Sequence, residues 1–180
     1  MRTLSLSLFG RFNADLDGVP LTAFRTLKVQ ALLIYLCAEP QTAQRREHLM
    51  TLLWPGMPET SARSNLRQVL FLLRQALNDH IAEDGPVPLL IANRHTIQLN
   101  PQAAVVVDTA QFDLLLSESH KHPHVDLLGC QTCYETLARA AALYGGDFLT
   151  EFYLDDSNLF EAWTETTRQM YRRRVLDTLE

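Results

Sequence analysis

The chain has 180 residues, of which 47% are hydrophobic and 21% are charged, with seven Gly and eight Pro. It is too apolar to be a disordered chain and too poor in Gly and Pro to be fibrous, and its length suits one large domain or two small ones. No apolar run reaches the roughly 18 residues of a membrane span, and the start lacks the continuous apolar core of a signal peptide. Three cysteines do not make a disulfide framework, so we expect a cytoplasmic protein without a membrane partner.

The net charge of −5 is distributed unevenly along the chain. Residues 1–103 carry ten Lys and Arg against eight Asp and Glu, whereas residues 104–180 carry six against thirteen. The stretch from Arg45 to Arg74 holds five arginines and only two acids. The negative net charge of the whole chain argues against nucleic acid as a partner, but the excess of arginine in this stretch permits it. The asymmetry indicates two modules with different partners, divided at 103/104.

The N-terminal residues have the pattern of a small antiparallel sheet followed by a buried helix. Leucines alternate with serines over residues 4–8, which is the period of a half-buried strand, and Asp17-Gly18 is a turn signal. The segment Leu27 to Ala38 is apolar almost all round and ends at Glu39-Pro40, as in a buried helix.

Two further helices and a hairpin complete the first half. One helix fits Arg45 to Trp54, and after a short loop a longer one fits Ser61 to Leu77. The segments 89–91 and 96–99 flank a polar tip and predict a β-hairpin. The apolar residues of the third helix recur at helical spacing: Leu66, Val69, Leu70, Leu73 and Leu77. A sheet, three helices and a terminal hairpin predict an α+β winged helix-turn-helix.

The second half is predicted to be all-helical. Asp108 is expected to cap a helix that runs to about Glu118, and the polar segment 119–124 interrupts the pattern. Helices over about 126–144 and from Ser157 onward follow, as in a helical-repeat module. Because the last helix reaches Glu180 without a cap, we expect the chain to be a fragment of a longer regulator.

The outward face of the predicted third helix suits the major groove of DNA. Arg can pair with guanine edges, Gln with adenine, and Phe can touch a thymine methyl, and no acid lies between residues 62 and 78. The alternative is an ordinary amphipathic helix whose arginines are solvated or lie on apolar surface. The place of this helix, between a short loop and a hairpin, favours DNA. The candidate residues are Arg63, Ser64, Arg67, Gln68, Phe71, Arg74 and Gln75.

The tip of the predicted hairpin, Asn93-Arg94-His95, is the candidate wing. An arginine at such a tip commonly reaches a phosphate or the minor groove, which makes Arg94 a further candidate for DNA contact. The alternative is an ordinary polar turn.

Motifs along the whole chain resemble the SARP-type bacterial transcriptional activators. In the second half the resemblance rests on Ala141 to Leu149, on Phe160-Glu-Ala-Trp163 and on Arg168. In the first half it rests on Phe9-Gly10, Asp17-Gly18, Lys28 to Leu36, Arg46 to Leu49, Leu53-Trp-Pro55, Ala62 to Arg67 and Leu73 to Leu77.

The resemblance implies an OmpR/PhoB-like winged helix over residues 1–103 and a bacterial transcriptional activator domain, tetratricopeptide-like and all-α, over residues 104–180. It implies binding to short direct repeats of double-stranded DNA at promoters, a homodimer on DNA, and contact with RNA polymerase. Phe71 and Leu72 depart from the small polar or basic residues that many relatives carry there, so no operator sequence is carried over.

No catalytic constellation is present in the sequence. It lacks a Gly-rich phosphate loop, a nucleophile elbow and a His-Glu-x-x-His motif, and the adjacent acids Asp155 and Asp156 are not spaced for paired acid–base work. An enzyme is therefore not expected. The alternatives to a DNA-binding activator are a protein-interaction scaffold and a metal- or redox-responsive regulator.

A cluster of histidines and cysteines is the basis of the last alternative. Two cysteines at C-x-x-C spacing with nearby histidines could form a zinc site. The competing interpretation, which we favour at this stage, is packing: Cys130 and Cys133 lie at core spacing on a predicted helix, and small buried thiols are common there. Redox chemistry is a third reading, although no strand precedes the motif. The zinc candidates are His120, His122, His124, Cys130 and Cys133.

Overall fold

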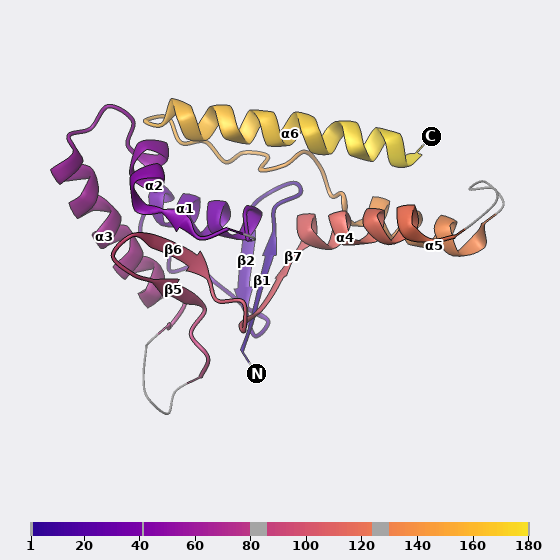
Figure 1. Ribbon diagram of the computed structural model, residues 1–180, viewed down its shortest axis with the longest axis horizontal. Coiled ribbons are helices and arrows are strands. Elements are labelled where there is room, and N and C mark those ends of the chain that lie inside the picture. The colour runs from indigo at the N-terminus through magenta and orange to yellow at the C-terminus, as the bar shows by residue number, and fades with distance from the viewer. Residues whose placement is uncertain (1, 41, 80–85, 124–129, 180) are drawn as a thin grey trace.

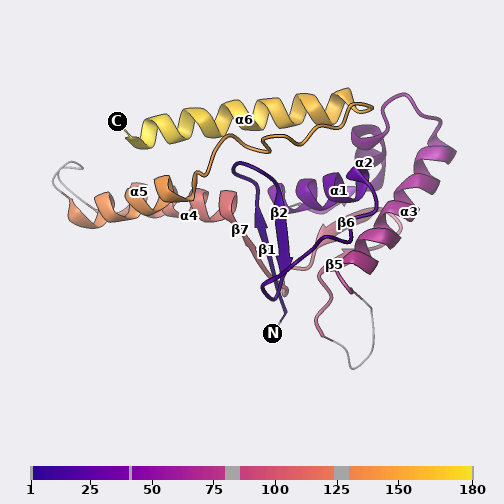
Figure 2. The ribbon, with the colours of Figure 1, turned by 180° about the vertical axis from the view of Figure 1, so that it is seen from behind.

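The computed structural model describes residues 2–40, 42–79, 86–123 and 130–179. Strands and helices are interspersed up to residue 107, and three helices follow (Figure 1). Helix α3 (Glu59–Ala76) lies at one end of the molecule and α5 (Gln131–Leu143) at the other, as the view from behind also shows (Figure 2). Helix α6 (Asn158–Leu179) runs along one side and bridges the two ends. Over the described residues, no helix combines the length and the apolarity that crossing a membrane requires.

The first sheet has the strand order β3-β2-β1-β7. Strands β1 (Thr3–Ser7), β2 (Asn13–Leu16) and β3 (Val19–Pro20) are antiparallel neighbours, which confirms the expected antiparallel sheet. Strand β7 (Ala104–Val107) was missed by the sequence analysis and pairs parallel to β1. Its β-branched valines suit a strand. Its partner lies about 100 residues earlier in the chain, however, and local periodicity cannot predict a pairing between such distant segments.

The sheet, the three helices and the hairpin expected for the first half are found in the described residues. Helix α1 (Leu27–Ala38) begins after Thr26, whose side chain accepts a hydrogen bond from the Val29 backbone N–H. Helix α2 (Arg46–Leu53) and α3 follow, and α3 begins two residues earlier than expected. The hairpin of β5 (Leu90–Ala92) and β6 (Thr96–Leu99) is joined by β4 (Gln44–Arg45), in the order β4-β6-β5.

The expected helices of the second half are found with changed ends. Helix α4 (Asp108–Lys121) continues past the expected end at Glu118, and α5 begins at Gln131, whereas the expected start near residue 126 lies outside the described residues. Asp108 is not the helix cap that we expected. Its carboxylate instead accepts hydrogen bonds of 2.9 Å from the backbone N–H groups of Leu8 and Phe9, which attaches the start of α4 to the end of β1.

The hydrophobic core is continuous across the expected boundary at 103/104. Phe9 follows β1, and its ring contacts three other aromatic rings edge-on. The distances between ring centroids are 5.5 Å to Phe112 of α4, 5.1 Å to Tyr144 and 5.1 Å to Tyr171 of α6. At the other end of α6, the buried hydroxyl of Ser157 donates to the Leu52 carbonyl of α2. The helical second half of the chain therefore packs directly against the first half.

Candidate nucleic-acid interface

Helix α3 is held by one apolar face and presents the opposite face to solvent. All five core positions expected from its spacing are buried, so the predicted orientation of the helix is confirmed: Leu66, Val69, Leu70, Leu73 and Leu77. Six of the seven candidate DNA-contacting residues are exposed: Arg63, Ser64, Arg67, Gln68, Phe71 and Gln75. Phe71 is 56% exposed, so its ring is available for contact with a partner on this face.

A cleft of about 730 Å³ lies between α2, α3 and the β5–β6 hairpin. It brings together three of the candidates, Arg63 and Arg67 from α3 and Arg94 from the hairpin tip, and adds Arg46 from α2. Glu47 is the one acid in its lining. Four guanidinium groups around one concave surface make a site for an anion such as a phosphate.

Arg46 is the residue that the sequence analysis missed. Its backbone N–H donates to the His95 carbonyl at 2.8 Å, and its side-chain Nε donates to the Asn93 carbonyl at 2.8 Å. Burial, followed by the positive charges of Arg67, Arg63 and Arg74, lowers the pKa of Arg46, as expected where like charges share a surface. An arginine at the start of a helix does not by itself indicate a DNA contact, because only the fold places Arg46 beside the hairpin tip.

Two of the three arginines of α3, Arg63 and Arg74, have partners within the protein. Arg74 is half-buried and donates to the Leu90 carbonyl of β5 at 3.4 Å, so this candidate connects α3 to the hairpin. Arg63 forms an ion pair with Glu59, an acid that the expected helix start at Ser61 had left outside the helix. Both groups of that pair are mostly exposed, so the pair is weak and Arg63 can exchange it for a phosphate.

The turn at the hairpin tip is built by Asn93. Its side-chain Oδ1 accepts hydrogen bonds from the backbone N–H groups of His95 at 2.7 Å and Thr96 at 2.8 Å. This Asx turn fixes the backbone while Arg94 stands exposed at the apex. The tip therefore has a defined backbone and a long cationic side chain that is able to reach outward.

The seven exposed candidate residues thus divide into two groups. Arg63, Arg67 and Arg94 line the cleft with Arg46, whereas the rest of the exposed α3 candidates lie outside its lining: Ser64, Gln68, Phe71 and Gln75. The cleft group is suited to phosphates. The outer group has the amide, hydroxyl and aromatic side chains that recognise base edges.

The histidine and cysteine candidates are only partly brought together. His122, Cys130 and Cys133 place their ligand atoms within 4.8 Å of one another, while His120 turns its Nδ1 to the Leu116 carbonyl at 2.6 Å. His124 lies outside the described residues. The expectation that both cysteines lie on the helix is wrong, because Cys130 immediately precedes α5; Cys133 is buried within it. A hydrogen bond from the Cys133 backbone N–H lowers the pKa of the Cys130 thiol.

No protein-family model and no curated protein matches the sequence. Among solved structures, the chain is similar to Mycobacterium tuberculosis EmbR in complex with a low-affinity phosphopeptide. The match covers 99% of this chain at 19% identity with a TM-score of 0.75. It covers 44% of the EmbR chain, so this chain spans less than half the length of that protein. At this identity the likeness shows the fold, and it shows that both halves of the chain occur in the same arrangement within a longer protein.

Proposed function

We propose that this chain is the DNA-binding part of a transcription regulator of the SARP type, and that it reads a specific sequence with α3 in the major groove. The observation that carries the proposal is the arginine-lined cleft between α3 and the wing, next to an exposed polar face of the same helix. A helix about 10–12 Å across fits a major groove about 12 Å wide. The fold likeness to EmbR and the sequence resemblance to SARP-type activators both support this assignment.

In this arrangement the two groups of side chains have different tasks. Arg46, Arg63 and Arg94 contact the phosphate backbone or the adjacent minor groove and fix the position of α3 on the duplex. Arg67 lies at the edge between the cleft and the outer face, and together with Gln68 it contacts base edges. Phe71, whose ring is exposed on this face, packs against a thymine methyl.

The helical half contributes protein contacts to the proposed regulator. Residues 104–180 carry six Lys and Arg against thirteen Asp and Glu, so this half is repelled by the DNA backbone. By its resemblance to the bacterial transcriptional activator domain, it contacts a second copy on neighbouring direct repeats and RNA polymerase at the promoter. Activation of transcription belongs to this part of the proposal.

The test is a selection of bound sequences from a pool of random duplex DNA, followed by titration of the selected site. Arg67→Ala and Gln68→Ala should each weaken binding to the selected site by about 1–3 kcal/mol, with little change on random DNA. Arg173→Ala, an exposed arginine of α6, is the matched control for the loss of one positive charge. Failure to enrich any sequence, or unaltered affinity in both α3 variants, would refute the assignment of α3 as the reading helix.

A further inference from the structure

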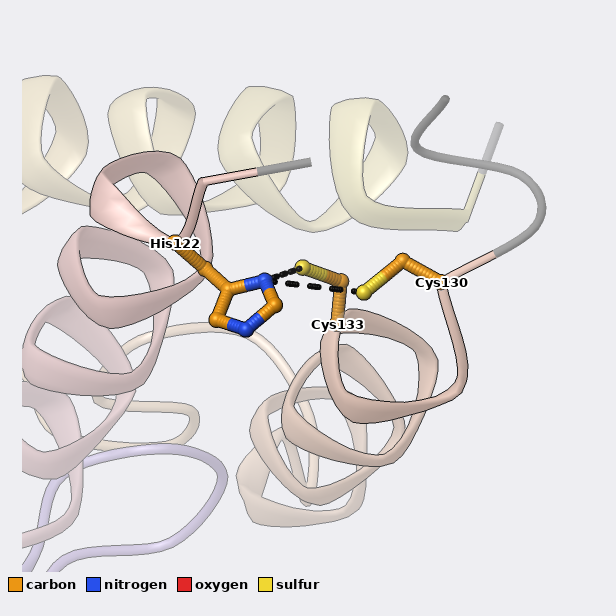
Figure 3. Close-up of side chains that lie close together, drawn as sticks. All are labelled: His122, Cys130 and Cys133. Atoms are coloured by element: carbon orange, nitrogen blue, oxygen red, sulfur yellow. Dashed lines mark hydrogen bonds between the residues drawn. The ribbon is translucent and has the colours of Figure 1, made fainter. Parts of the chain in front are cut away.

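Two cysteine sulfurs and one imidazole nitrogen meet where the end of α4 faces the start of α5. The His122 ring lies just after α4, and its Nδ1 points toward both cysteine sulfurs, as Figure 3 shows. The distances from Nδ1 are 3.5 Å to Cys130 Sγ and 3.4 Å to Cys133 Sγ. Cys133 is 1% exposed, whereas Cys130 and His122 are half-buried, so the cluster lies at the edge of the fold with access from solvent.

These distances are close to the spacing that one tetrahedral metal ion imposes on its ligands. With Zn–S bonds of about 2.3 Å and Zn–N bonds of about 2.0–2.1 Å, tetrahedral angles place a nitrogen and a sulfur ligand about 3.5 Å apart. Hence the imidazole nitrogen already lies at the separation from each sulfur that a bound site requires. Thiolate and imidazole ligands favour zinc over the harder cations, which prefer oxygen.

We propose that His122, Cys130 and Cys133 form a zinc site with three protein ligands, and that a water or another small ligand completes the tetrahedron. This replaces our sequence-based preference for packing. The site is independent of the proposed DNA-binding surface, which uses none of these residues.

Packing alone does not account for the arrangement. Cys133 has the burial and the helical spacing to Ala140 that a core position requires, and its thiol lies 3.9 Å from the Ser119 carbonyl of α4. Cys130, however, precedes the helix and is not fully buried, so core spacing does not explain it. Nor does a core require both sulfurs to face the same imidazole nitrogen.

Zinc at this place would bind the end of α4 to the start of α5. Seven residues, 123–129, separate His122 from Cys130 in the sequence, so the ion would cross-link two packed helices over a short span of sequence. Because the ligands come from both helix ends, metal binding is coupled to the docking of α5 on α4. We therefore expect zinc to stabilise the docking of α5 on α4 and to raise the melting temperature of the chain.

The experiment uses the 180-residue chain, purified without a histidine tag and without added metal. Elemental analysis should find about one zinc per chain. The chain stripped of metal should bind Co²⁺ and show the thiolate-to-cobalt charge-transfer bands and the strong visible bands of a tetrahedral site. His122→Ala and Cys130→Ser should each weaken Co²⁺ binding by at least about 100-fold, since a direct ligand contributes more than the surrounding residues that tune it.

His120→Ala is the matched control, because it removes a neighbouring histidine that is bonded to the Leu116 carbonyl. It should bind Co²⁺ like the parent protein. Far-ultraviolet circular dichroism of each variant establishes that loss of metal is not loss of fold. A chelator should lower the melting temperature of the parent but not that of Cys130→Ser.

Three results would overturn the proposal. The first is a folded parent protein that takes up neither zinc nor Co²⁺. The second is Co²⁺ binding that His122→Ala and Cys130→Ser leave intact. The third is a parent protein, purified without reductant, whose mass shows a Cys130–Cys133 disulfide and which binds no metal after reduction, because the pair would then be a redox pair. None of these results bears on the reading helix, whose test is sequence-specific DNA binding.

Discussion

The side chain of Arg46 donates a hydrogen bond of 2.8 Å to the backbone carbonyl of Asn93, and so the first residue of α2 holds the wing. The same residue lines the arginine cleft, where burial and three neighbouring arginines lower its pKa. Arg46 therefore has two tasks in the proposed interface. It orients the wing by a directed hydrogen bond, and it adds one positive charge to the surface that meets the DNA.

Arg46→Ala and Arg46→Lys should separate these two tasks. The alanine variant loses both the charge and the hydrogen bond, so DNA binding should weaken and the free energy of unfolding should fall by about 1 kcal/mol. Lysine retains the charge but has no Nε donor in a guanidinium plane, so the stability loss should remain while much of the non-specific binding returns. Urea unfolding and DNA titration of both variants provide the measurement. Equal DNA affinity in all three proteins would place Arg46 outside the interface.

Arg94 should behave as a contact to the DNA backbone. It is exposed at the apex of a turn that Asn93 fixes, so its removal leaves the fold intact. We expect Arg94→Ala to weaken binding to selected and random DNA alike and to reduce the slope of log affinity against log salt by about one unit. Titrations at several salt concentrations measure this slope. A slope identical to that of the parent would show that the wing does not touch phosphate.

The first half should not be stable without the second. A chain of residues 1–103 loses the β7 partner of β1, and Phe9 loses its aromatic neighbours Phe112, Tyr144 and Tyr171. Removing the contacts of one buried aromatic ring costs about 3–5 kcal/mol, so the shortened chain should melt well below the parent or aggregate. Thermal melts of both chains at the same concentration measure this. A shortened chain as stable as the parent would restore residue 103/104 as a true domain boundary.

The sequence predicted those parts of the fold that depend on local pattern. The apolar spacing of α3 was sufficient to orient the helix, and two strand-like segments around a polar tip were sufficient to predict the hairpin. The sequence did not reveal the pairing of β7 with β1 or the packing of α6 on α2, because these contacts join residues about 100 positions apart. For the same reason the sequence did not reveal that Arg46 approaches the hairpin tip. The candidates on α3 could be predicted because they share one face of a single helix.

The contact between Gly10 and Gly146 shows how two distant motifs of the resemblance depend on each other. A Cβ on Gly146 would lie 3.3 Å from the Gly10 Cα, and both glycines have positive φ. The Gly10 N–H donates to the Asp147 carbonyl at 2.9 Å, and the Leu149 N–H donates to the Leu8 carbonyl at 2.8 Å. Sequence inspection identified both motifs but gave no indication that their backbones touch.

Asp147 should make the stability of this contact depend on pH. Hydrogen bonds from the Arg172 side chain, and then from the Tyr144 hydroxyl at 2.6 Å, lower the pKa of the Asp147 carboxyl. A carboxyl whose pKa is lower in the folded than in the unfolded protein stabilises the fold above its unfolded pKa, near 4. That contribution decreases below about pH 5 and is lost as the pH falls through the lowered folded pKa.

Asp147→Asn should therefore destabilise the protein most near neutral pH, and the difference from the parent should shrink on acidification. The Asp147 and Arg172 side chains are 34% and 56% exposed, so solvent screening limits the effect to at most about 1 kcal/mol, less at high salt. Asp155→Asn, an exposed aspartate in the loop before α6, is the control, because no described contact of its side chain is lost. Urea unfolding of the three proteins at steps from pH 7 to pH 3 measures the differences. A difference that stays constant over this range would mean that the ion pair with Arg172 does not contribute to stability.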